Sequence, residues 1–161
     1  MKRLAIVLIG FIAAYSQAAT YHVATTGSDA ADGSVGTPWL TIQHAANTMA
    51  SGDSVVVASG TYPEIVHTMA NGTGGNYITF LGTSLPIVHG FYFTNSFNNV
   101  NGFSIRGTNS TIAVNFGTTG NNCIVQSNRV ERTPHDVVQL GMDYSNPLVA
   151  PSNNTIHANR F

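Results

Sequence analysis

The chain has 161 residues, with six Lys plus Arg, seven Asp plus Glu, and only 8% charged residues. This length suits one domain, and the lack of a basic excess argues against a protein that binds nucleic acids through a basic face. Gly, Asn, Thr and Ser are abundant, a composition that disfavours helices and favours turns.

Residues 1–18 have the composition of a secretory signal peptide. Lys2-Arg3 forms a charged start, an apolar run follows from Leu4 to Ala14, and Ser16-Gln17-Ala18 has the small-x-small pattern of a cleavage site. The apolar run is short for a hydrocarbon core of roughly 30 Å. We therefore expect cleavage after Ala18, no membrane contact after cleavage, and a secreted, periplasmic or cell-surface protein.

The mature chain that this cleavage would leave is acidic and has no disulfide framework. It carries four arginines, no lysine and seven acidic residues, so its net charge is about −3. Cys123 is the single cysteine and lies in a strand-like run, which is typical of a buried core residue. Stability must therefore come from core burial and backbone hydrogen bonds.

Residues 38–50 are predicted to form an amphipathic helix. Thr37 suits the N-cap and Pro38 the first turn. Apolar residues recur at helical spacing on one face, at Trp39, Ile42, Ala45, Ala46 and Met49. The residues after this helix are predicted below to form a stack of β-strands, whose first layer would leave apolar surface and unpaired strand edges exposed. We expect the helix to cover that end of the stack.

Short apolar runs recur about every 23 residues from residue 54 onward, a period typical of solenoids. The markers Val55, Ile78, Val100 and Cys123 follow one another at nearly equal intervals. The next step, to Thr155, is clearly longer and requires an irregular insertion at 143–151. A second series runs through Val66, Val88, Ile112 and Val138. This repeat, rich in β-branched residues, predicts a solenoid of stacked parallel strands.

Asparagines recur with the same repeat. They precede the predicted strands at Asn98-Asn99, Asn121-Asn122 and Asn153-Asn154, and follow them at Asn128 and Asn159. Asn tolerates left-handed backbone and can hydrogen-bond along a stack. We interpret these residues as turn-forming ladders and not as ligands.

Several separate motifs between Tyr21 and Tyr62 occur in a fixed order. They are Gly27-Ser28-Asp29 with Gly33, Pro38-Trp39-x-Thr41-Ile42-x-x-Ala45, Gly52-Asp53-x-Val55-x-Val57, and Gly60-Thr61-Tyr62. This succession resembles the N-terminal signature of exported bacterial right-handed parallel β-helix proteins, among them pectate-lyase-like polysaccharide lyases of family nine. The resemblance implies an all-β, right-handed parallel β-helix over residues 19–161.

The resemblance also implies a chemistry. In those lyases calcium held by carboxylates neutralises the uronate, and a basic residue, usually lysine, removes the adjacent proton. Their acidic run corresponds to His135–Gln139, where Asp136 is the match by residue type. Their lysine lies on a later coil, beyond Phe161. Calcium is the implied cofactor, while the general base is missing from this sequence.

The richest charged cluster of the chain runs from Arg129 to Asp143. The catalytic candidates are Arg132, His135 and Asp136, the substrate-binding candidates are Arg129, Arg132, Gln139 and Asp143, and the calcium candidates are Asp29, Asp32 and Asp136. Arginine binds a sugar carboxylate in bidentate fashion, and histidine exchanges protons near neutral pH. The alternatives are an exposed edge where Glu131 faces the arginines, and ordinary turn formation at the Asp29–Asp32 loop.

Three functions are consistent with these patterns. The first is a polysaccharide lyase or hydrolase that acts on an acidic polymer such as pectate. The second is a non-catalytic carbohydrate-binding or adhesion module. The third is an inactive fragment of a larger β-helix enzyme, since the chain ends on a strand-like segment without a polar cap. We expect a monomer, or copies that stack end to end through the last coil.

Overall fold

The computed structural model describes residues 17–108, 112–131, 138–140 and 151–161, which contain one helix and twelve strands. The strands are β1 (Thr20–Val23), β2 (Ser54–Val57), β3 (Thr61–His67), β4 (Ile78–Gly82), β5 (Ile87–Phe93), β6 (Asn98–Asn101), β7 (Ser104–Arg106), β8 (Val114–Phe116), β9 (Ile124–Gln126), β10 (Arg129–Glu131), β11 (Val138–Leu140) and β12 (Thr155–His157). None of these described elements is a helix that could span a bilayer. Most of the predicted signal peptide lies outside the described residues.

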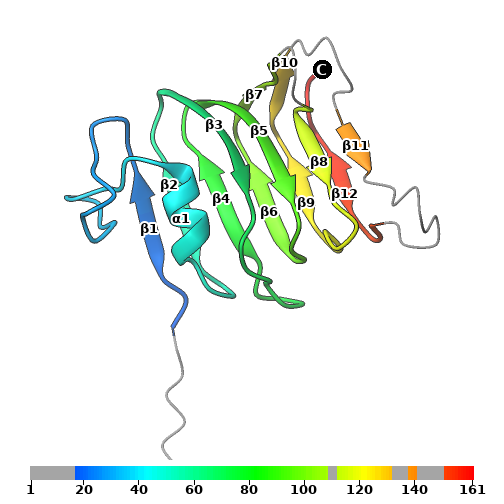
Figure 1. The fold of residues 1–161 in the computed structure, drawn as a ribbon, viewed down its shortest axis with the longest axis horizontal. Coiled ribbons are helices and arrows are strands. Elements are labelled where there is room, and N and C mark those ends of the chain that lie inside the picture. Colours follow the sequence, from blue (N-terminus) through cyan, green and yellow to red (C-terminus); the bar gives the residue numbers. More distant parts are fainter. Residues whose placement is uncertain (1–16, 109–111, 132–137, 141–150) are drawn as a thin grey trace, which may run out of the picture.

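The strands form two sheets in which every strand pair is parallel. The first sheet has the order β1-β2-β4-β6-β9-β12, and the second has the order β10-β7-β5-β8-β11, with β3 paired to β5. After β2 the chain passes repeatedly from one sheet to the other and back, and each later strand of the first sheet is added next to the one before (Figure 1). The prediction of an all-β fold built from parallel strands is confirmed.

The register of the first sheet supports the repeat and corrects its markers. Val55 pairs with Phe80, Phe80 with Val100, and Val100 with Val125, so the true steps are alternately a little longer and a little shorter than the predicted interval. The markers Ile78 and Cys123 were each wrong by two positions. Side chains alternate with a period of two, so a shift of two keeps a residue on the same face and leaves the apolar pattern unchanged.

The second series of markers needs a similar correction. Val66 pairs with Phe91, Phe91 with Val114, and Val114 with Val138, so the markers Val88 and Ile112 were wrong. Val88 belongs to a different column, in which it pairs with Tyr62 and Ile105.

Strand β5 joins two columns of the second sheet. Its first residues pair with β7, and Phe91–Phe93 pair with β8. Beyond them β10 pairs with β7 and β11 with β8. The second sheet therefore presents two adjacent outer surfaces, one over β7 and β10 and the other over β3, β5 and β8.

Phenylalanine side chains fill the interior between the sheets. Five of them are almost completely buried, namely Phe80, Phe91, Phe93, Phe103 and Phe116. The ring of Phe91 lies 5.7 Å from that of Phe80 and 5.2 Å from that of Phe103, measured between centroids. Tyr92 lies between two inward residues of β5 and is partly exposed. The five buried rings thus form an internal cluster, and Tyr92 lies outside it.

The predicted helix exists but is shorter than residues 38–50. Helix α1 spans Ile42–Thr48, and its N-cap is Thr41, whose hydroxyl accepts a hydrogen bond from the His44 N–H at 3.1 Å. The prediction of Thr37 as the N-cap was wrong. Trp39 forms a parallel bridge with Val23 and is therefore held in extended backbone before the helix begins.

Helix α1 supplies hydrogen-bond partners to strand β3. The Glu64 carboxylate on β3 accepts from the Ile42 and Gln43 N–H groups at 3.0 and 2.8 Å. The Gln43 amide donates to the His67 carbonyl at 3.1 Å and accepts from the His67 N–H at 2.8 Å. The helix therefore lies along the first strand of the second sheet and pairs with its backbone, as expected of a covering element.

The asparagine ladder is confirmed at the turns that follow β6, β9 and β12. The Asn128 amide donates to the Val100 carbonyl at 3.0 Å, and the Asn159 amide donates to the Val125 carbonyl at 2.9 Å. Asn128 also accepts from the Phe103 N–H at 2.8 Å. These side chains connect successive layers of the stack through their backbones.

Candidate functional site

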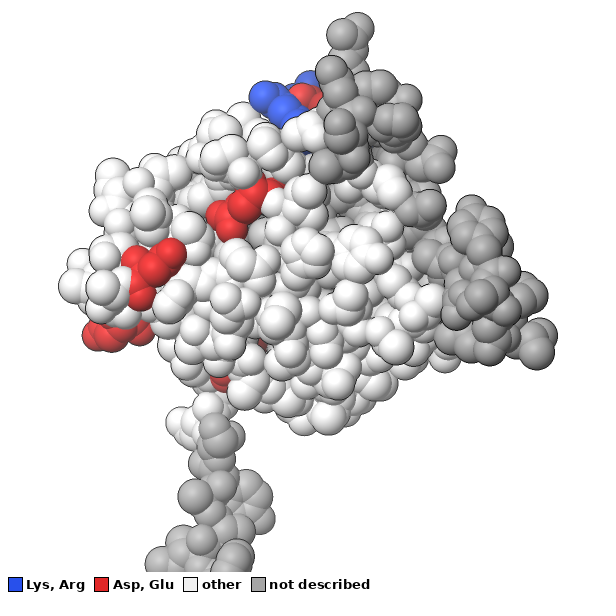
Figure 2. Space-filling model, viewed as in Figure 1, with Lys and Arg blue, Asp and Glu red and all other residues white. Residues whose placement is uncertain are grey.

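Three arginines line one hollow at the end of the second sheet. This hollow, here called the arginine hollow, has a volume of about 750 Å³ and is lined by Arg106, Arg129, Val130, Glu131, Arg160 and Phe161. Figure 2 shows the basic side chains of this face gathered in one place with a carboxylate beside them. Every arginine that the structure describes lies here.

The strand register brings these residues together from separate parts of the chain. Arg106 on β7 pairs with Glu131 on β10, and Arg129 on β10 forms a bridge with Arg160. Ile105 and Val130 alternate with them and are buried at 0% and 4% exposure. Because side chains alternate along a strand, the charged residues point away from the core.

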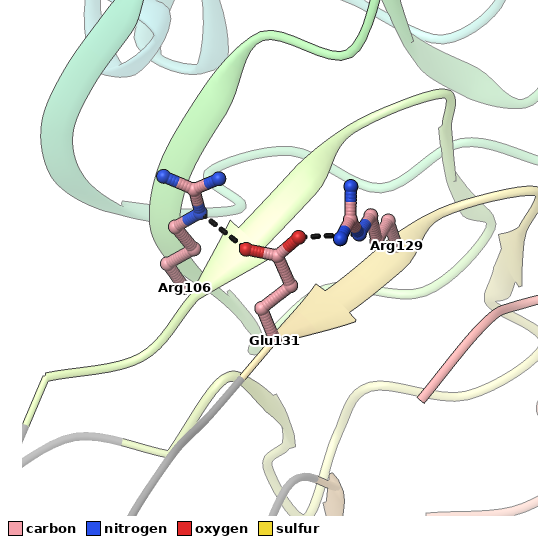
Figure 3. Close-up of polar contacts among 3 residues, drawn as sticks. All are labelled: Arg106, Arg129 and Glu131. Atoms are coloured by element: carbon pink, nitrogen blue, oxygen red, sulfur yellow. Dashed lines mark hydrogen bonds and ion pairs between the residues drawn. The ribbon is translucent and has the colours of Figure 1, made fainter.

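Glu131 lies between two of the arginines. Its Oε2 accepts from the Arg106 Nε at 2.7 Å, and its Oε1 forms an ion pair with the Arg129 Nε (Figure 3). The Glu131 side chain is 24% exposed, whereas those of Arg106 and Arg129 are 47% and 57% exposed. The expectation that Glu131 faces the arginines near it in sequence is confirmed for Arg129, whereas Arg132 lies outside the described residues and Arg106 was not expected. Arg106, Arg129 and Glu131 together carry one positive charge.

This arrangement leaves binding capacity on the arginines. Among the described residues, Glu131 is bound through the Nε of each guanidinium, and the terminal nitrogens of Arg106 point away from it (Figure 3). Two terminal N–H groups of one guanidinium match the two oxygens of a carboxylate. The Arg106 and Arg129 side chains are about half exposed, so an incoming anion can reach their terminal nitrogens while Glu131 stays bound to each Nε.

The predicted site residues are partly located. Arg129 is in the arginine hollow. Gln139 lies on β11 and pairs in register with Asn115, on the neighbouring column. Arg132, His135, Asp136 and Asp143 lie outside the described residues.

Sequence reasoning missed Arg106, Arg160 and Phe161 as members of the site. One available signal was spacing, because the separation of Arg106 and Glu131 along the chain is close to one repeat. Residues one repeat apart lie side by side in stacked strands.

Asp29 and Asp32 both accept hydrogen bonds within their own part of the chain. Asp29 accepts from the Leu40 and Thr41 N–H groups at 2.9 Å and from the Thr41 hydroxyl at 2.8 Å. Partial burial acts to raise the pKa of Asp29, but these hydrogen bonds and the nearby His44 outweigh it and lower the pKa. The Asp29 carboxylate therefore fixes the chain just before α1.

Asp32 accepts from the Thr37 hydroxyl and from the Ser34 N–H, and these hydrogen bonds lower its pKa. The described residues contain no group of three or more His, Cys, Asp or Glu side chains placed to hold a metal ion. A hard cation such as calcium requires several oxygen ligands. Calcium binding at this loop remains a prediction.

Cys123 is completely buried. Its thiol lies 3.3 Å from the Asn95 carbonyl and 3.4 Å from the Asn121 carbonyl. Burial raises the pKa of Cys123 to about 11. The thiolate is therefore scarce at neutral pH, and the interpretation of Cys123 as a core residue is confirmed.

Comparison with known proteins identifies the fold and not a family. The sequence matches no protein-family model and no curated protein. Among solved structures it is similar to a rhamnogalacturonan lyase, with a TM-score of 0.61, 16% identity, and coverage of 87% of this chain and 50% of that one. It is also similar to a GH136 lacto-N-biosidase from Eubacterium ramulus, with a TM-score of 0.64, 13% identity, and coverage of 88% and 34%. The chain thus shares its fold with about half of the first protein and about a third of the second.

Proposed function

We propose that this chain belongs to an exported right-handed parallel β-helix protein related to polysaccharide lyases, and that it binds an acidic polysaccharide such as pectate. The alternation between two parallel sheets and the regular repeat of their strands support the β-helix. The similarity to a rhamnogalacturonan lyase and a lacto-N-biosidase supports a carbohydrate ligand. The leader at residues 1–18 supports export.

The convergence of three arginines on one hollow carries the acidic part of this proposal. The hollow has a volume of about 750 Å³, which is within the range of ligand sites. Three of its described lining residues are arginines, and one, Glu131, has a carboxylate side chain. The four side chains together carry a charge of about +2 in a mature chain of about −3. A uronate polymer carries repeated carboxylates, which suits repeated bidentate contacts.

We propose binding without elimination for this chain. Elimination next to a uronate carboxylate requires a neutral base that takes the proton while the bond to the neighbouring sugar breaks. The mature sequence contains no lysine for this role. Of the described calcium candidates, Asp29 accepts hydrogen bonds through both carboxylate oxygens and Asp32 through Oδ1, and calcium at this loop stays a proposal. Asp136 remains a proposed calcium ligand.

A binding assay with polygalacturonate tests the proposal. We expect the mature chain to bind with an affinity that falls as salt increases, because exposed charges are screened. Arg129→Ala should weaken binding about tenfold, which corresponds to the loss of about 1.4 kcal/mol. Glu131→Gln should instead tighten binding, because it removes the negative charge that competes with the ligand. In a parallel sample that contains calcium, the ultraviolet absorbance is recorded, because elimination would release unsaturated products that absorb there.

The opposite effects of these two substitutions separate specific binding from loss of folding. Thr79→Ala, on the first sheet and away from the arginines, is the matched control and should bind like the unaltered chain. Equal affinity of Arg129→Ala and the unaltered chain would contradict the arginine hollow as the site. A rise in absorbance would contradict binding without elimination.

A further inference from the structure

A second, smaller hollow lies on the neighbouring outer surface of the second sheet. It has a volume of about 190 Å³ and is lined by Ile65, His67, Tyr92, Ile112 and Asn115. These residues come from β3, β5, β8 and the residues just before β8. None of them lines the arginine hollow, so this is a separate site, here called the tyrosine hollow.

Strand register places three of these residues in one row. His67 pairs with Tyr92, and Tyr92 pairs with Asn115, so they stand on adjacent strands roughly 4.8 Å apart. Their neighbours Phe91 and Phe93 are buried at 1% and 0% exposure. His67 is exposed and Tyr92 is partly exposed, whereas Asn115 is buried at 8% exposure, so the first two side chains are the accessible ones. The rings of His67 and Tyr92 lie 5.2 Å apart with a tilt of 32°, so they form an angled pair and not a flat stack.

The backbone beneath this row is held by hydrogen bonds. The Gln43 amide binds both the N–H and the carbonyl of His67, at 2.8 and 3.1 Å. The Thr68 N–H donates to the Tyr92 carbonyl at 3.0 Å, and the Thr68 hydroxyl accepts from the Thr94 N–H at 3.2 Å. A site whose backbone is fixed before binding loses less conformational entropy when a ligand arrives.

The chemistry of the lining suits an uncharged ring with both apolar and polar groups. Ile65 and Ile112 provide apolar walls, Tyr92 provides an aromatic face with a polar end, and His67 provides ring nitrogens. None of the described lining residues is Lys, Arg, Asp or Glu. The volume lies below the roughly 300–1,000 Å³ of sites for larger ligands, so it fits one ring at most.

We propose that the tyrosine hollow is a subsite for one neutral pyranose. Tyr92 packs against the C–H face of the sugar, while the exposed His67 ring exchanges hydrogen bonds with its hydroxyls. This inference rests on the proposed function in one respect, namely that the ligand is a carbohydrate. It does not require an acidic polymer or the arginine hollow.

The experiment is an NMR titration of the mature chain with two neutral probes, methyl β-D-galactopyranoside and methyl α-L-rhamnopyranoside. At least one probe should give saturable shifts at His67, Tyr92 and Asn115. Tyr92→Ala should reduce the affinity at least tenfold, whereas Tyr92→Phe should retain most of it because the ring remains. His67→Ala provides a second variant if Tyr92→Ala folds poorly, as judged by circular dichroism and thermal unfolding.

Tyr77→Ala is the matched control, since Tyr77 is a partly exposed aromatic residue that packs against Phe97 at 5.8 Å, away from this row. It should leave the shifts unchanged. The absence of saturable shifts with both probes would overturn the subsite, and so would unchanged affinity in folded Tyr92→Ala.

Arg129→Ala separates this inference from the proposed function. It should lower the affinity for polygalacturonate and leave the neutral-sugar shifts intact. If polygalacturonate fails to bind while the neutral probes still shift Tyr92, the acidic proposal fails and the subsite stands.

Discussion

At the scale of single residues, Asn128 shows how one side chain connects three layers of the stack. It is 2% exposed, donates to the Val100 carbonyl below it, and accepts from the Phe103 N–H. Its own N–H donates to the Asn159 side chain above it at 2.8 Å. Leaving buried backbone groups without partners costs about 1–3 kcal/mol each.

We therefore predict that Asn128→Ala lowers the free energy of unfolding by about 2–4 kcal/mol, because two buried backbone groups lose their partner. Urea denaturation measures this change. Asn99→Ala provides the control, because Asn99 is partly exposed on β6, and it should change stability by less than about 1 kcal/mol. Similar losses in the two variants would contradict a structural role of the ladder.

At the scale of elements, the start of helix α1 is determined by contacts with a distant loop. Gly27 lies against the chain near Trp39, where an added Cβ would be 2.2 Å from the Trp39 carbonyl oxygen. This close approach places Asp29 where it can bind the Leu40 and Thr41 N–H groups. Local packing thus accounts for the order of Gly27, Asp29 and Trp39 in the motif.

Asp29→Asn should lower the free energy of unfolding by about 1–2 kcal/mol at neutral pH, since hydrogen bonds to a charged acceptor become neutral ones. The folded-state pKa of Asp29 lies below its ordinary value of 3.8, so its stabilising contribution is present above that pH. The contribution disappears as pH falls through the lower folded-state pKa.

Urea unfolding of Asp29→Asn and the unaltered chain, at neutral pH and well below pH 3.8, measures this dependence. The stability difference should shrink in acid. A difference that is the same at both pH values would show that the Asp29 charge does not contribute.

At the scale of the whole molecule, the two sides of β5 have opposite roles. Phe91 packs against Phe80, Phe93 and Phe103, which come from both sheets and from the turn that follows β6. Tyr92, the next residue, faces outward in the tyrosine hollow. One strand therefore supplies both the shared core and a candidate binding surface.

Phe91→Ala should lower the free energy of unfolding by about 3–5 kcal/mol, because it leaves a cavity at the centre of the phenylalanine cluster. Total stabilities are about 5–15 kcal/mol, so this loss is large for the whole domain. Thermal unfolding followed by Trp39 fluorescence measures it. Tyr92→Ala serves as the comparison and should cost less than about 1.5 kcal/mol, and equal losses would contradict the assigned orientations.

The sequence by itself determined the parallel all-β repeat, the turn-forming role of Asn128 and Asn159, the burial of Cys123, and the existence of a helix before β2. These properties depend on local composition and on periodicity along the chain, which are readable without long-range contacts. The prediction that Glu131 faces arginines also followed from residues close in sequence.

The tertiary structure decided the register, the start of α1 and the membership of both hollows. A shift of two positions preserves the inward face, so the apolar pattern could not distinguish Ile78 from Phe80 as the partner of Val55. The helix start depends on Asp29, which lies well before Thr41 in the chain. Arg106, Arg129 and Arg160 meet because stacking brings together residues that are far apart along the chain, and apolar periodicity carries no information about which exposed side chains become neighbours.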